Sequence, residues 1–131
     1  MTYRHLTLEY DGALARLTLN RPDQANALGL VLAEELCAAL AEAETRADCH
    51  VLLLQGSGRF FCAGGDVAAM AAAADQSGFL KELAGKLHEA VMALVKSRLI
   101  SIAVVNGPAA GAGLGLVLNS DFILASPRAR F

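Results

Sequence analysis

The sequence contains few aromatic residues and few charges of either sign. Tryptophan is absent, and aromatic residues make up 5% and charged residues 18% of the 131 residues, whereas 55% are hydrophobic. This composition excludes a disordered polar chain and predicts one domain, or part of one, with a core of Ala, Leu and Val. The formal net charge is −2, and no cluster combines basic with aromatic residues, so we expect no nucleic-acid partner.

Cysteine is also scarce. The sequence has three cysteines, Cys37, Cys49 and Cys62, and none of their spacings is typical of a zinc site or a redox motif. Their odd number argues against a disulfide framework, and buried, reduced thiols in a cytoplasmic protein fit better. The first residues lack the apolar core of a signal peptide. We therefore expect a cytoplasmic location and no metal.

One long uncharged run, residues 99–120, contains two GxxxG pairs and has the length of a transmembrane helix. However, Asn106, Gly107 and Pro108 lie in its middle and have strong turn chemistry. They divide the run into halves that are too short to span a bilayer. We expect a buried strand, a turn and a helix here, and no membrane partner.

Expected strands and helices alternate along the chain. Period-two patterns on both sides of Asp11 and Gly12 predict a hairpin. Helical periodicity and apolar runs then predict helices at residues 28–47, 67–74, 79–96 and 114–118, and strands at residues 51–55, 102–105 and 122–125. This order predicts an α/β fold with parallel strands. The last expected strand has no covering element after it, from which we expect a truncated or cleaved polypeptide.

Two glycine-rich turns carry the functional signal. Residues 61–66 read Phe-Cys-Ala-Gly-Gly-Asp, and residues 106–113 read Asn-Gly-Pro-Ala-Ala-Gly-Ala-Gly. Each turn lies between an expected strand and an expected helix, where a bare backbone N–H can donate to a negative oxygen. Two such turns in one fold suggest two donors that stabilise one oxyanion.

Together with Asn26-Ala27-Leu28 upstream, these turns resemble the crotonase, or enoyl-CoA hydratase/isomerase, superfamily. The resemblance implies a crotonase-like ββα superhelix, truncated before its C-terminal helices, with residues 1–131 as the N-terminal portion of a single acyl-CoA-binding domain. It implies an acyl-CoA thioester as substrate and no separate cofactor, because coenzyme A is part of the substrate. The expected partners are further copies in a homotrimer or hexamer and the missing C-terminal part of the same polypeptide.

The resemblance also assigns site residues. The two oxyanion donors fall on the backbone N–H groups of Gly65 and Ala112. The implied substrate contacts are Ala25, Ala63, Gly64, Gly65, Asp66, Val67 and Ala112. Asp66 could serve as an acid, but capping of the following helix is the favoured interpretation. Cys62 invites a nucleophile hypothesis, yet no His is close in sequence, and a packed thiol is favoured.

Gly115 departs from the family pattern. Hydratases of the family carry a carboxylate at this position, and their second carboxylate would fall a few residues beyond Phe131. Since Gly115 cannot act as acid or base, a single base that moves a proton from C2 to C4 fits better. We therefore favour double-bond isomerisation of an enoyl-CoA in fatty acid metabolism. The alternatives are hydration (a lyase reaction), another crotonase-fold reaction, or a catalytically silent acyl-CoA-binding or scaffold subunit.

Overall fold

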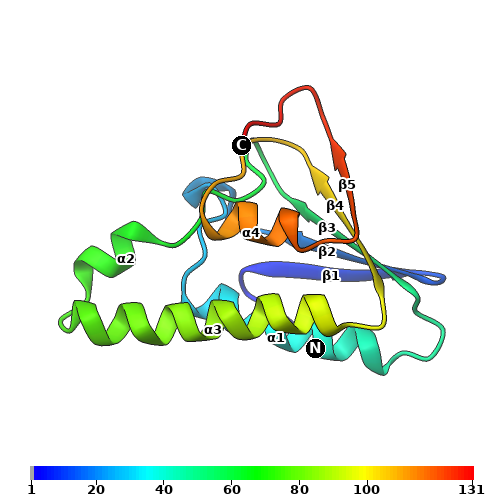
Figure 1. The fold of residues 1–131 in the computed structure, drawn as a ribbon, viewed down its shortest axis with the longest axis horizontal. Helices are drawn as coiled ribbons and strands as arrows, with labels where there is room; N and C mark the ends of the chain where they lie inside the picture. Colours follow the sequence, from blue (N-terminus) through cyan, green and yellow to red (C-terminus); the bar gives the residue numbers. More distant parts are fainter. Residues whose placement is uncertain (1) are drawn as a thin grey trace.

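One mixed five-stranded sheet forms the centre of the computed structural model, which describes residues 2–131 (Figure 1). The strand order follows the sequence, β1-β2-β3-β4-β5. β1 and β2 form the predicted antiparallel hairpin, and the pairs from β2 to β5 are parallel, as expected. The strands are β1 (Leu6–Asp11), β2 (Leu14–Leu19), β3 (Val51–Gly56), β4 (Ile100–Val105) and β5 (Phe122–Ala125).

Helices connect the parallel strands. α1 (Leu30–Thr45) and α3 (Gln76–Lys96) pack side by side along the sheet, and the short α4 (Ala112–Leu118) lies between β4 and β5 in the chain (Figure 1). The remaining helices are the 3₁₀ turn η1 (Pro22–Gln24) and α2 (Val67–Ala72). Buried residues of α1 recur every three or four positions, which is the apolar stripe that a helix needs to cover a sheet.

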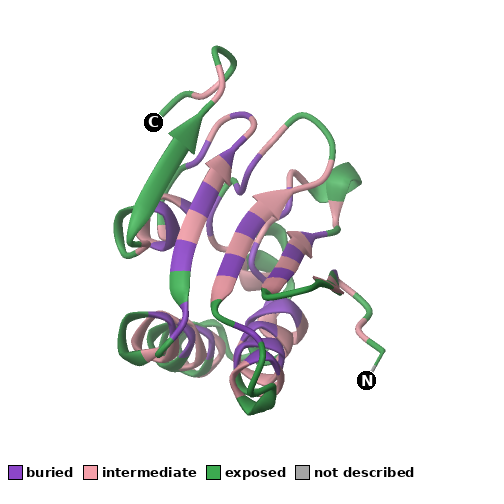
Figure 2. Ribbon diagram, turned by 90° about the vertical axis from the view of Figure 1, so that its right-hand side faces the viewer, coloured by how far each residue is buried: buried purple, intermediate pink, exposed green. Residues whose placement is uncertain are grey.

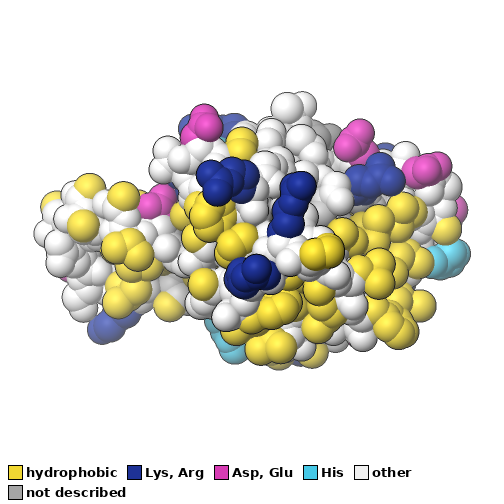
Figure 3. Space-filling model, turned by 90° about the horizontal axis from the view of Figure 1, so that it is seen from above, with side chains coloured by type: hydrophobic (Ala, Val, Ile, Leu, Met, Phe, Trp, Pro, Cys, Tyr) yellow, Lys and Arg dark blue, Asp and Glu magenta, His cyan; other side chains and the backbone are white. Residues whose placement is uncertain are grey.

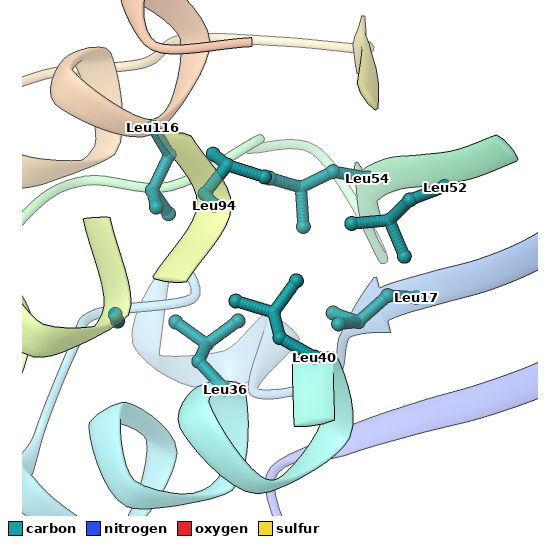
Figure 4. A pocket seen from close by; sticks show the side chains of 8 residues that line it. Leu17, Leu36, Leu40, Leu52, Leu54, Leu94 and Leu116 are labelled. Atoms are coloured by element: carbon teal, nitrogen blue, oxygen red, sulfur yellow. The ribbon is translucent and has the colours of Figure 1, made fainter. Parts of the chain in front are cut away.

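The core lies between the sheet and α1, α3 and α4. Leu52 and Leu54 of β3 are buried whereas their neighbours are partly exposed, and this alternation appears along the inner strands in Figure 2. Leucines from the strands and all three helices surround a cavity of about 10 Å³ (Figure 4). A space of this size holds at most one water molecule, and its lining is apolar, so it is a packing defect and not a ligand site.

The start of α1 differs from the prediction, because the helix begins at Leu30 and not at residue 28. Leu28 instead forms a parallel bridge with Gly65 in the first glycine turn. Its N–H donates to Gly64 O at an N···O distance of 2.7 Å, and its O accepts from Asp66 N at 3.1 Å. Leu28 is therefore extended, and the helix starts only after it.

α3 begins at Gln76, earlier than the predicted residue 79. The Asp75 carboxylate accepts a hydrogen bond from Gly78 N at 3.0 Å, so it caps the helix and satisfies one of its free donors. The residues between the two predicted helices, 75–78, therefore form the cap and the first turn of α3.

Residues 99–120 form β4, a turn and α4, which confirms the predicted subdivision of the uncharged run. Among the residues that the structure describes, no helix combines the length and the apolar character needed to cross a membrane.

β5 is the most exposed strand. All four of its side chains are exposed, with Phe122 at 61% and Leu124 at 60%. α4 and β5 line an apolar groove of about 430 Å³ that Phe131 also contacts. Seen from above, a large group of hydrophobic side chains lies on the right of the molecule, and smaller groups lie elsewhere on this face (Figure 3). β5 is thus an apolar strand that lies uncovered in the described chain.

Candidate active site at two glycine turns

The first glycine turn follows β3 and packs against the second turn. The N–H groups of Phe61 and Cys62 both donate to Pro108 O, at 3.1 and 3.2 Å. Gly64 has a φ of +104°, a conformation that favours glycine, and a Cβ at this position would lie 2.9 Å from Ala110 O. The close approach of the two turns therefore requires a residue without a side chain at Gly64.

The second turn follows β4 and leads directly into α4. Ala109 forms a parallel bridge with Cys62, and Ala110 N donates to Cys62 O at 3.0 Å. Gly111 has a φ of +55° and precedes Ala112, the first residue of α4. The two turns thus meet because they follow β3 and β4, which are neighbouring parallel strands.

In each turn one backbone N–H points away from the residues to which the turn is hydrogen-bonded. Gly64 O accepts from Leu28 N, and in a trans peptide the next N–H, that of Gly65, points the opposite way. By the same argument the Ala112 N–H points out of the start of α4, because the Gly111 carbonyl accepts from a residue within the helix. Among residues 2–131 neither N–H donates to a protein acceptor. Both are available to an oxygen of a bound molecule.

The two donors lie on neighbouring stretches of backbone. A Cβ placed on Gly64 would lie 3.6 Å from the nitrogen of Ala112, and a Cβ on Gly111 would lie 3.8 Å from the Cα of Gly64. The arrangement can present two N–H groups to a small anion, with the flexible end of the Met70 side chain beside Gly65.

The predicted substrate contacts surround the same place. Ala63 N donates to Ala25 O at 3.0 Å, so these two residues are adjacent. Val67, at the start of α2, is 72% exposed, which leaves its side chain open to a ligand. Of the predicted contacts, Ala63 and Val67 are exposed, whereas Gly64 is buried. Their contact with a substrate remains a prediction.

Asp66 caps α2. Its Oδ1 accepts from Ala69 N at 3.0 Å, which is the contact of an N-cap and agrees with the favoured interpretation. Its Oδ2 lies 3.2 Å from Nη1 of Arg21. Both carboxylate oxygens are thus engaged, and this position suits a structural anion better than a proton donor.

Cys62 is a packed thiol, as expected. Its side chain is buried, and Sγ lies 3.2 Å from Asn26 O. Burial raises the pKa of this thiol to about 11, so the nucleophilic thiolate is scarce at neutral pH. No group of three or more His, Cys, Asp or Glu side chains among the described residues could hold a metal ion.

Asn26 fastens the loop before α1 to the first turn, a role that the sequence did not reveal. The residue is fully buried, its Oδ1 accepts from Arg21 N at 2.8 Å, and its Nδ2 donates to Ser57 O and Phe60 O at 2.9 and 3.0 Å. Asn26 and its neighbour Ala25 both have a φ of +54°, in the left-handed region. The sequence offered only the Asn-Ala-Leu pattern itself as a signal.

Three arginines lie beside the second turn. Arg59, Arg128 and Arg130 line a hollow of about 430 Å³ together with Pro108. Basic side chains are visible near the middle of the face seen from above (Figure 3). The protein as a whole has a net charge of −2, so this hollow is a local concentration of positive charge.

Solved structures define the class of protein. The chain is similar to PA4980 from Pseudomonas aeruginosa, with a TM-score of 0.92 and 35% identity over 97% of this chain and 55% of that one. It is also similar to a putative enoyl-CoA hydratase from Streptomyces coelicolor A3(2), with a TM-score of 0.86 and 36% identity over 99% of this chain and 48% of that one. The fold is that of the crotonase superfamily, as the resemblance implied.

The chain belongs to the enoyl-CoA hydratase/isomerase family, whose model matches residues 9–131. It is 37% identical to the probable enoyl-CoA hydratase EchA14 of Mycobacterium tuberculosis, over 98% of this chain and 50% of the relative. It is 30% identical to the trans-2-decenoyl-[acyl-carrier-protein] isomerase of Streptococcus mutans, over 100% of this chain and 51% of the relative. The chain spans about half the length of these relatives.

Proposed function

We propose that the two glycine turns form the oxyanion hole of an enzyme that acts on an acyl-CoA thioester. The observation that supports this is the pair of N–H groups, Gly65 and Ala112, on adjoining backbone with no acceptor among the described residues. Ala25, Ala63, Gly64, Asp66 and Val67 would border the path of the substrate. Family membership supports the thioester as the substrate class.

The chemistry needs two donors because charge develops on the thioester oxygen. A base removes a proton from C2, and the electron pair moves onto the carbonyl oxygen to give an enolate. Backbone N–H groups that are already in place stabilise this oxygen without reorganisation, and each contributes about 3 kcal/mol to lowering the barrier. The electrostatic part of catalysis would therefore lie in this chain.

We further propose double-bond isomerisation, in which one base returns the proton to C4 and the double bond moves from C3–C4 to C2–C3. Gly115 supports this choice, because it carries no acid or base and a Cβ there would meet no atom within 4 Å. We propose that the single base lies beyond residue 131, as the family resemblance implies. One relative bears the name of an isomerase, which agrees with such a reaction in the family.

Hydration is the second candidate, since several relatives are named probable enoyl-CoA hydratases. A silent acyl-CoA-binding subunit is the third, and Gly115 supports it equally well. In all three the positive hollow at Arg59, Arg128 and Arg130 suits an anionic group such as a CoA phosphate. We also propose that the protein forms a homotrimer or hexamer, which light scattering can measure. We propose a cytoplasmic location as well.

The deciding experiment supplies the protein with 3-enoyl-CoA and 2-enoyl-CoA in separate reactions. Conversion of the 3-enoyl to the 2-enoyl compound without 3-hydroxyacyl-CoA supports the isomerase. Rapid formation of 3-hydroxyacyl-CoA from the 2-enoyl compound supports the hydratase instead. Tight binding of butyryl-CoA by calorimetry without any turnover supports the silent subunit, and absence of both binding and turnover rejects all three.

A further inference from the structure

The side chain of Arg21 ties the loop before α1 to the first glycine turn. Its Nη1 donates to Ala27 O at 2.8 Å and to Asp66 Oδ2 at 3.2 Å. The Arg21 and Asp66 side chains are only 16% and 13% exposed, which limits screening by solvent. Ala27 precedes Leu28, and Asp66 follows Gly65. A single guanidinium thus holds both chain segments of the Leu28–Gly65 bridge.

Gly65 depends on this bridge because it has no side chain that could fix its own peptide. The direction of its N–H is set by the hydrogen bond from Leu28 N to Gly64 O at 2.7 Å. The Asp66 N–H, bonded to Leu28 O at 3.1 Å, fixes the peptide on the other side. If the two segments separate, the Gly64–Gly65 peptide is free to rotate and its N–H no longer has a defined direction.

We infer that Arg21 is a positioning residue that keeps the Gly65 N–H directed at the thioester oxygen. This inference rests on the proposed function, in which Gly65 supplies one oxyanion donor. Arg21 acts through the Ala27 carbonyl and the Asp66 carboxylate and needs no contact with a reacting atom. A purely structural role would lower thermal stability and leave the polarisation of a bound thioester unchanged.

The test compares the wild-type protein with Arg21→Met and Arg21→Lys. Lys86→Met is the control. It removes the ion pair on α3 between Lys86 Nζ and Glu89 Oε2, which lie 2.9 Å apart. The probe is butyryl-CoA with ¹³C at the thioester carbonyl, which is saturated and cannot isomerise. The measurements are the carbonyl chemical shift in the complex, the Kd by calorimetry and the melting temperature.

We expect the wild type and the control to shift the bound carbonyl downfield equally, because two N–H donors polarise it. Arg21→Met should lose about half of that shift, while its Kd weakens by less than about threefold, since one donor and the remaining contacts persist. Arg21→Lys should recover part of the shift, because the ammonium keeps its charge near Asp66 but lacks the planar geometry of the guanidinium.

The outcomes distinguish the role of Arg21 from the existence of the oxyanion hole. Equal shifts in the wild type and Arg21→Met overturn the role of Arg21 alone. A wild-type protein that does not bind the probe, or binds it without a shift, overturns the oxyanion hole and the role of Arg21 with it. If Arg21→Met does not fold, Arg21→Lys decides, and an unchanged shift in that variant overturns the inference.

Discussion

The two glycine turns each present one backbone N–H, but they fix its direction by different means. In the first turn the preceding carbonyl, that of Gly64, accepts from Leu28 on a distant part of the chain. In the second the preceding carbonyl, that of Gly111, accepts from Gly115 one helical turn further on. One donor thus depends on tertiary contacts and the other on a local helix. Distant substitutions should disturb the first turn much more than the second.

Removal of an N–H donor should have the largest effect on activity, and its effect on thermal stability should differ between the two turns. Ala112→Pro deletes the N–H at the first position of α4, where proline is well tolerated. Gly65→Pro deletes it in a turn that is bridged to Leu28. We expect each variant to lower kcat/KM by about 10²- to 10³-fold. Thermal melting should show a loss of stability in Gly65→Pro and little change in Ala112→Pro.

The matched control is Gly65→Ala, which keeps the N–H. Its added Cβ would lie 2.8 Å from the end of the flexible Met70 side chain, which can move aside. Steady-state kinetics should find this variant much closer to wild type than Gly65→Pro. Near wild-type turnover in both proline variants would contradict the assignment of the donors.

Alanine substitutions at the positive-φ glycines of the two turns, Gly64 and Gly111, should give an intermediate effect on stability. Gly64→Ala combines a φ of +104° with a contact of 2.9 Å to Ala110 O, and we expect it to lower the free energy of unfolding by about 1–3 kcal/mol. Gly111→Ala adds only the cost of its backbone conformation, φ +55° and ψ −128°, about 1–3 kcal/mol, because the nearest atom lies 3.8 Å away. Urea denaturation measures both, and a larger loss in Gly111→Ala would contradict the contact argument.

The smallest effect is expected within α4 and has the opposite sign. Gly115→Ala places a methyl group in open space inside a helix, so it should raise the free energy of unfolding by about 0.5–1 kcal/mol. The control is Gly113→Ala, whose Cβ would lie 2.9 Å from the Sγ of the buried Cys62 and should be destabilising. Urea denaturation of both variants checks the pair, and a loss of stability in Gly115→Ala would show that this position is not open.

Much of this fold can be predicted from local sequence signals. The hairpin at Gly12 follows from a turn pair between period-two runs, and the strands follow from short apolar runs. The glycine turns follow from backbone conformations that other residues rarely adopt, as at Gly64. These features succeed because each is decided by residues within a few positions of one another.

Contacts between distant segments could not be read from the sequence. Arg21 and Asp66 are separated by 45 positions, and no pattern in either segment indicates that they pair. The extended conformation of Leu28 also escaped prediction, because its apolar side chain fits a helical stripe equally well and only the bridge to Gly65 excludes it. The start of α1 and the contacts that hold the Gly65 N–H in place are set by tertiary structure and not by local sequence.

Two consecutive left-handed residues, Ala25 and Asn26, give the loop before α1 an energetic character of its own. Asparagine tolerates a φ of +54°, but alanine at the same value costs about 1–2 kcal/mol. The backbone of the loop is therefore strained at Ala25, and the buried hydrogen bonds of the Asn26 amide hold it in this conformation. In the proposed function this loop borders the substrate, and because its hydrogen bonds already fix its conformation, binding would cost it little further conformational entropy.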